Sequence, residues 1–168
     1  MPPLLLALSY WLHMLATIVW VGGLAMMALV AWPGAQKILG PGPTMAALVA
    51  EWQRRFNPLA WLSLAVLIAT GLTQMTANKN YAGFLNIANA WTAAILTKHI
   101  AVGGMIVIGA FMNGALQPAL ARLALLESRG KPAPEIEILR RRELALIRLN
   151  LACGILVLAL TAVARAVG

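Results

Sequence analysis

Two histidines, His13 and His99, are the residues of this chain whose type and surroundings could support metal chemistry. They are its only histidines, and each lies in a stretch apolar enough to cross a lipid bilayer. An ionisable side chain at membrane depth is costly, so it usually faces a bundle interior, a cavity or a ligand. Two such imidazoles suggest one shared ligand.

Helices that cross a membrane must position these histidines. The chain is 61% hydrophobic and 11% charged over 168 residues, which indicates an integral membrane protein. Segments long enough to span about 30 Å of hydrocarbon cover residues 4–32, 58–76, 90–116 and 145–167. The first lacks a basic n-region, so we expect a retained helix and not a signal peptide. With no internal repeat evident, we predict an all-α fold in which residues 1–168 form a single up-down-up-down four-helix bundle.

The net charge of +8 is distributed as a topology signal. Most arginines and lysines lie between the first and second spans or between the third and fourth, whereas Lys79 and Arg165 lie on the other side. By the positive-inside bias, we expect both termini outside a bacterial-type inner (plasma) membrane. No nucleic-acid-binding module accompanies the charge, so the expected partner is the lipid bilayer and not nucleic acid. Glycines and prolines end the first span, and residues 44–56 are then expected to form a short helix at the cytoplasmic interface.

The two histidines are predicted to lie level in the bilayer. Each is about nine residues into its span from the outside, or roughly 13 Å deep at about 1.5 Å per residue. In an up-down-up-down bundle the first and third helices are diagonal, about 11 to 14 Å apart. That separation is too wide for one small ion and suits a porphyrin whose iron is ligated on both faces. We therefore predict one b-type haem with His13 and His99 as axial ligands, which favours electron transfer to a redox partner or within a larger membrane complex.

Other residues on the same helix faces could complete this site. A glycine one turn from His99 would let a flat macrocycle approach the backbone. Hydroxyl groups at i−4 and i+4 from His13 could hydrogen-bond the ligand or support the imidazole ring. Two cations near the outer surface are available for the haem propionates. These candidate residues are Gly103, Ser9, Thr17, Lys98 and Arg165.

Structural and copper-binding interpretations compete with the haem hypothesis. Histidines in transmembrane helices can join neighbouring helices by hydrogen bonds, and Asn113 is expected to do so. Methionine is a soft copper ligand, and His13, Met14 and Met75 could approach one another in the outer half of the bundle, although scattered methionines more often serve packing. The methionines that could be copper ligands are Met14, Met26, Met27, Met75, Met105 and Met112. Cys153 stands alone in the chain and is expected to be an inert buried thiol.

Several stretches resemble the membrane domain of copper resistance protein D (CopD). The resembling letters are HMLATIVWVGGL at 13–24, RRFNPLAWLSLAVLIATGL at 54–72, LTKHIAVGG at 96–104, and REL at 142–144. The resemblance implies a membrane protein associated with copper uptake or resistance. It places counterparts of that family's residues at His13, Trp20, Gly22, Gly23 and Lys98.

The HemJ-type protoporphyrinogen oxidases are also similar to this chain, through His13 and Lys98. That resemblance implies b-type haem and porphyrinogen oxidation. The functions left open are haem-based electron transfer, copper uptake or resistance, porphyrinogen oxidation, and an accessory role in a larger complex in which the histidines join helices. Whether the protein is an enzyme stays open with them.

Overall fold

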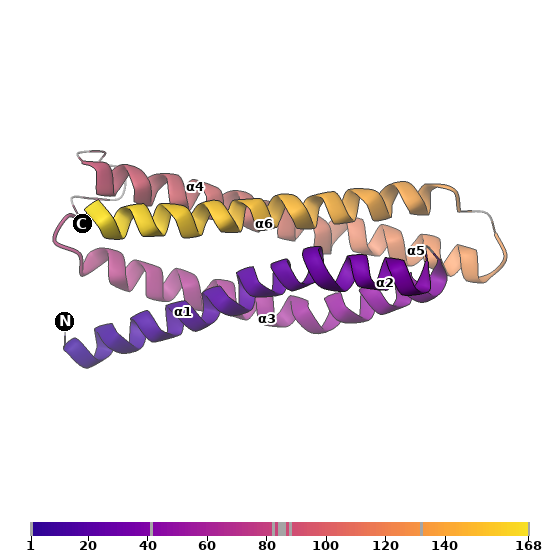
Figure 1. The fold of residues 1–168 in the computed structure, drawn as a ribbon, viewed down its shortest axis with the longest axis horizontal. Helices are drawn as coiled ribbons and strands as arrows, with labels where there is room; N and C mark the ends of the chain where they lie inside the picture. The colour runs from indigo at the N-terminus through magenta and orange to yellow at the C-terminus, as the bar shows by residue number, and fades with distance from the viewer. Residues whose placement is uncertain are drawn as a thin grey trace.

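The computed structural model is a bundle of four long helical rods (Figure 1). It describes residues 2–40, 42–81, 83, 87, 89–131 and 133–167, and no strand occurs among them. The rods are Pro3–Leu39, Pro43–Thr76, Ala90–Ser128 and Glu135–Val167, each long and apolar enough to cross a membrane. Large apolar side chains such as Ile18, Ile100 and Val107 are exposed on their outer faces. The predicted all-α fold with four spans is confirmed, and the protein is a multi-pass membrane protein.

The first and third rods share an irregular build. The first consists of α1 (Pro3–Ala25), a π-helical turn η1 (Met26–Ala31) and α2 (Trp32–Leu39). The third consists of α4 (Ala90–Phe111), the π-helical turn η2 (Met112–Leu116) and α5 (Gln117–Ser128). A proline follows each π-helical turn, at the second residue of α2 and of α5. Because a prolyl ring crowds the carbonyl four residues earlier and lacks an N–H, the helix widens before it.

Two predicted helix boundaries are wrong. The first rod does not end near Pro33, since the π-helical turn absorbs the proline and the helix continues to Leu39. Residues 44–56 are not a separate interfacial helix but the first part of α3 (Pro43–Thr76), which runs through Pro58. Met45 and Val49 bury this part of α3 in the main hydrophobic core, so tertiary packing holds it in line with the span.

The rods pair into two hairpins. α1 lies along α3, and α4 lies along α6 (Glu135–Val167), while α1 and η1 also contact α6 (Figure 1). Among the described residues, the α1 and α4 backbones do not come into contact, and neither do those of α3 and α4. α1 and α4 are therefore diagonal, as predicted. α1 begins and α6 ends at the same end of the bundle, which we call the terminal end, and the opposite end is the basic end.

The two hairpins repeat one plan that the sequence analysis did not detect. Each π-helical turn begins thirteen residues after a histidine, at Met26 after His13 and at Met112 after His99. α3 and α6 each carry a threonine six residues before their last residue, and these are Thr70 and Thr161. Each threonine hydroxyl donates to the valine carbonyl four residues earlier. The repeat escapes notice in the sequence because few residue identities accompany it.

Two glycines set how closely the helices approach. A Cβ at Gly23 of α1 would overlap the ring of Phe56 on α3, so only glycine fits there without displacing the ring. A Cβ at Gly154 of α6 would lie 3.4 Å from both Met105 and Val21, where α6 meets α4 and α1 together. The helices therefore pack closely where α1 meets α3 and where α6 meets α4 and α1, whereas the side between α3 and α4 is more open.

Candidate functional site

His13 lies toward the terminal end of α1 and is bonded to the neighbouring helix α3. Its Nδ1 is 2.8 Å from the Thr70 hydroxyl oxygen, and that hydroxyl donates to the Val66 carbonyl at 2.6 Å. The hydroxyl has one proton, so it must accept from the Nδ1–H of His13. This assigns the tautomer and makes Nε2 the nitrogen with the lone pair, which is the state of a ligating imidazole.

The predicted hydroxyl residues are arranged around this bond. The Ser9 hydroxyl donates to the Thr70 carbonyl at 3.3 Å, which ties α1 to the residue that holds the imidazole. The Thr17 hydroxyl donates to the His13 carbonyl at 2.7 Å, within α1 itself. The His13 ring also lies beside Gly71, where an added Cβ would be 3.6 Å from its Cε1. These contacts fix the ring against α3.

His99 is held within its own helix. Its Nδ1 lies 2.7 Å from the Ile95 carbonyl oxygen, one turn earlier in α4. A carbonyl oxygen can only accept, so Nδ1 carries the proton here as well. An added Cβ at Gly103 would meet nothing within 4 Å, so the space beside that glycine is open. The α1 and α4 backbones, which carry the two histidines, do not come into contact in the described residues.

The two predicted cations gather near His13. The charges of Lys98 on α4 and Arg165 on α6 both act on His13, and that of Arg165 acts on Lys98. The Arg165 guanidinium carbon is also 4.7 Å from the centre of the Tyr10 ring, a cation–π contact that ties α6 to α1. The terminal end of the bundle thus exposes the His13 imidazole to the charges of Lys98 and Arg165.

The methionines named with His13 do not converge there. Met14 is 58% exposed on the outer face of α1. Met75 is buried in a separate small core with Trp91 and Ala94. In the described residues, no three His, Cys, Asp or Glu side chains gather into a metal site. A side-chain copper site therefore needs thioether ligands from elsewhere in the bundle.

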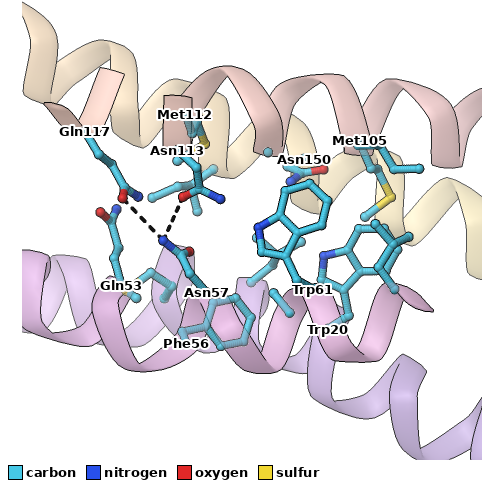
Figure 2. Close-up of a pocket in the computed structure, with 17 residues that line it drawn as sticks. Trp20, Gln53, Phe56, Asn57, Trp61, Met105, Met112, Asn113, Gln117 and Asn150 are labelled. Atoms are coloured by element: carbon cyan, nitrogen blue, oxygen red, sulfur yellow. Dashed lines mark hydrogen bonds between the residues drawn. The ribbon is translucent and has the colours of Figure 1, made fainter. Parts of the chain in front are cut away.

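Such thioethers line a cavity that the sequence analysis missed. This interior cavity, with an empty volume of about 640 Å³ including space open to the surroundings, lies between α3 and the α4–η2 segment, where those helices do not touch. Figure 2 shows the Trp20 and Trp61 indoles standing across it, with Met105 and Asn150 facing them. Its wall includes three methionines, which are Met27, Met105 and Met112.

Amide side chains form the polar part of the cavity wall. The Asn57 amide donates to the Asn113 oxygen at 2.7 Å and to the Gln117 oxygen at 3.3 Å (Figure 2), which confirms that Asn113 joins two helices. Asn150 is 4% exposed, and its amide oxygen has no hydrogen-bond partner among the described residues. A buried polar atom without a partner is costly and calls for an explanation. The sequence signal that was available for this site is a set of amide side chains at membrane depth, at Asn57, Asn113 and Gln117.

A second cavity adjoins the interior cavity on the side of the basic end. This basic-end cavity has an empty volume of about 1370 Å³, counted in the same way. Its charged lining residues are Arg54, Arg140 and Glu143. The residues that line both cavities are Gln53, Asn57, Trp61, Asn113 and Gln117. The two cavities therefore adjoin at four amide side chains, which we call the amide cluster: Gln53, Asn57, Asn113 and Gln117.

Comparison with known proteins gives one family. The family model described as copper resistance protein D matches residues 50–164, which cover most of α3 and extend through α6 to Ala164. No curated protein and no solved structure matches the chain. The match includes Met105, Met112 and the amide cluster, whereas His13 and Met27 precede it. Because the matched range is more than half of the chain, the protein belongs to the copper resistance protein D (CopD) family.

Proposed function

We propose that this CopD-family protein takes Cu(I) into the interior cavity and so handles copper within the membrane. The observation that carries the proposal is the presence of Met27, Met105 and Met112 in the cavity wall. Thioether sulfur is a soft ligand that suits Cu(I). Met105 is only 1% exposed, so its side chain is buried from lipid, and the residue lines the cavity.

The spacing of these methionines suits an ion in passage. Met105 and Met112 belong to one rod and are separated by about two helical turns, or roughly 10 Å. They therefore offer successive donors and not one closed coordination sphere. A pathway needs binding that is strong enough for entry and weak enough for release, which separate single donors provide.

The charge distribution orients this pathway. Most lysines and arginines lie at or near the basic end, so that end faces the cytoplasm and both termini lie outside the bacterial-type inner membrane. The interior cavity meets the basic-end cavity at the amide cluster. Copper would therefore leave the interior cavity past these amides toward the cytoplasmic side.

Cu(I) titration of the detergent-purified protein against a chromophoric Cu(I) chelator tests the proposal. The variant Met105→Leu/Met112→Leu nearly conserves side-chain volume and should weaken Cu(I) binding at least about tenfold. Met14→Leu is the matched control, because Met14 faces outward. Equal Cu(I) affinity in the wild type and the double variant would contradict the proposal.

A second candidate function, haem-based electron transfer, is favoured by a different observation. His13 and His99 both direct Nδ1–H to an acceptor, and ligating histidines almost always do so. The residue types fit a b-type haem, which His13 and His99 would hold, with Gly103 beside an open space and Lys98 and Arg165 as cations for its propionates. Haem bound in this way would supply one-electron transfer.

Reduced-minus-oxidised visible spectra test this candidate. We expect an alpha band of b-type haem that is lost in His13→Ala and in His99→Ala. Thr97→Val serves as the control, since the exposed Thr97 hydroxyl donates to the Ala93 carbonyl of its own helix. A wild-type protein that is purified after growth with ample haem and shows no band would rule the candidate out.

A further inference from the structure

We propose that Glu143 is a cation-accepting station at the basic end, through which Cu(I) passes between the interior cavity and the cytoplasmic side. The inference rests on the proposed copper function and adds a residue and a role to it. Glu143 belongs to α6 and lines the basic-end cavity. It is 3% exposed, which makes it a buried carboxyl group at a cavity wall.

The partner of Glu143 is neutral. Its Oε1 accepts a hydrogen bond of 2.7 Å from the Gln53 amide, which is itself buried on α3. Gln53 lines both cavities, so this bond lies where they meet. A single amide donor leaves most of the acceptor capacity of a carboxylate unused. The Glu143–Gln53 pair can therefore open toward an arriving cation.

Glu143 differs from the other carboxylates, because three of those are in ion pairs and the fourth, Glu135, is exposed. Ion pairs join Glu51 with Arg54 and Arg55, Glu127 with Arg140, and Glu137 with Arg141. None of the ion pairs in the described part of the chain includes Glu143. Burying a carboxylate without an ion-pair partner is destabilising, and the nearby Arg140, whose charge acts on Glu143, forms its ion pair with Glu127. Retaining one at a cavity wall is explained if a mobile cation is its partner.

Charge along the path supports the same role. The other charged residues that line the basic-end cavity are Arg54 and Arg140, which repel a cation. Each of them is engaged by a carboxylate, at 2.8 Å and 3.8 Å respectively. Glu143 supplies the one negative charge among the lining residues. Its oxygen is a harder ligand than thioether sulfur, so it would neutralise Cu(I) without retaining it.

Transport in proteoliposomes, measured with Cu(I) outside and a chromophoric Cu(I) chelator inside, tests the inference. Glu143→Gln should lower the Cu(I) flux about tenfold and leave Cu(I) affinity in detergent unchanged. Glu143→Asp keeps the charge and should restore most of the flux, a rescue that a purely structural role would not show. Glu137→Gln, on the same helix but outside both cavity walls, should transport as the wild type does.

The outcomes separate this inference from the proposed function. Wild-type flux in Glu143→Gln, or equal loss in Glu143→Gln and Glu143→Asp, overturns the role of Glu143 while copper binding stands. A wild-type protein that neither binds nor transports Cu(I) overturns both. Thermal unfolding of each variant in detergent shows whether a lost flux reflects lost folding.

Discussion

The two hairpins share one plan but hold their histidines differently. In the first, His13 is bonded across to Thr70 on the paired helix. In the second, His99 turns its Nδ1 to Ile95 in its own helix, and Thr161, at the position corresponding to Thr70, donates to the Val157 carbonyl. The comparison teaches that a repeated backbone plan can carry one imidazole bonded across to the paired helix and one bonded to a carbonyl of its own helix.

The hairpins also meet unequally. α1 contacts α6, whereas the corresponding pair, α3 and α4, has no backbone contact in the described residues. The interior cavity lies on that second side, and the amides of Asn57 and Asn113 bridge it at one level. The departure from symmetry is therefore what makes room for a binding site.

Substituting the equivalent glycines gives the largest expected contrast between the hairpins. Gly23 and Gly109 each lie ten residues after a histidine. Gly23→Ala should lower the free energy of unfolding by about 3 kcal/mol, because the new methyl overlaps Phe56. Gly109→Ala meets nothing within 4 Å and should change it by less than about 1 kcal/mol. Denaturant unfolding in detergent measures both, and equal effects would contradict the unequal packing of the hairpins.

The amide groups of the cavity give the next contrast. Asn57→Leu leaves the Asn113 and Gln117 oxygens without their donor and should cost about 2 kcal/mol of unfolding free energy. Asn150→Leu removes a buried oxygen that has no partner among the described residues and should be neutral or slightly stabilising. The same unfolding measurement compares them. A large loss in Asn150→Leu would show that its oxygen has a partner, such as water, inside the protein.

The threonines give the smallest contrast. Thr70→Val removes the acceptor of the His13 Nδ1–H and should cost about 1 kcal/mol, whereas Thr161→Val should cost less than about 0.5 kcal/mol. The ¹⁵N shifts of the imidazole provide a second measurement. We expect the Nδ1–H tautomer of His13 in the wild type and a mixture of tautomers in Thr70→Val. An unchanged spectrum would mean that Thr70 does not select the tautomer.

The spans were predictable because membrane length and apolar composition are local properties of the sequence. The helix ends were less predictable than the spans. A proline usually indicates a break, but Pro33 and Pro118 each follow a π-helical turn, and the helix continues through them. The continuation of α3 through residues 44–56 depends on burial of Met45 and Val49 against distant residues. Such contacts leave no mark in the local pattern.

The candidate site was predictable only where one residue type was rare. Two histidines in apolar surroundings stand out, but the bond from His13 to Thr70 joins residues 57 positions apart. The interior cavity needed Met27, Met105 and Met112 to be brought to one wall by helices from both hairpins. All three were among the possible copper ligands in the sequence, but methionine is common in membrane bundles, so the sequence did not indicate which methionines share a cavity.

The two hairpins contact each other along one side of the bundle and leave the opposite side open. α1 and α6 form the closed side, and α3 and α4 form the open side, where α5 contacts α3 near the basic end. Any rotation of one hairpin relative to the other about the α1–α6 contact would change the distance between α3 and α4 most. One spectroscopic distance between labels on α3 and α4 would therefore report the opening of the whole molecule.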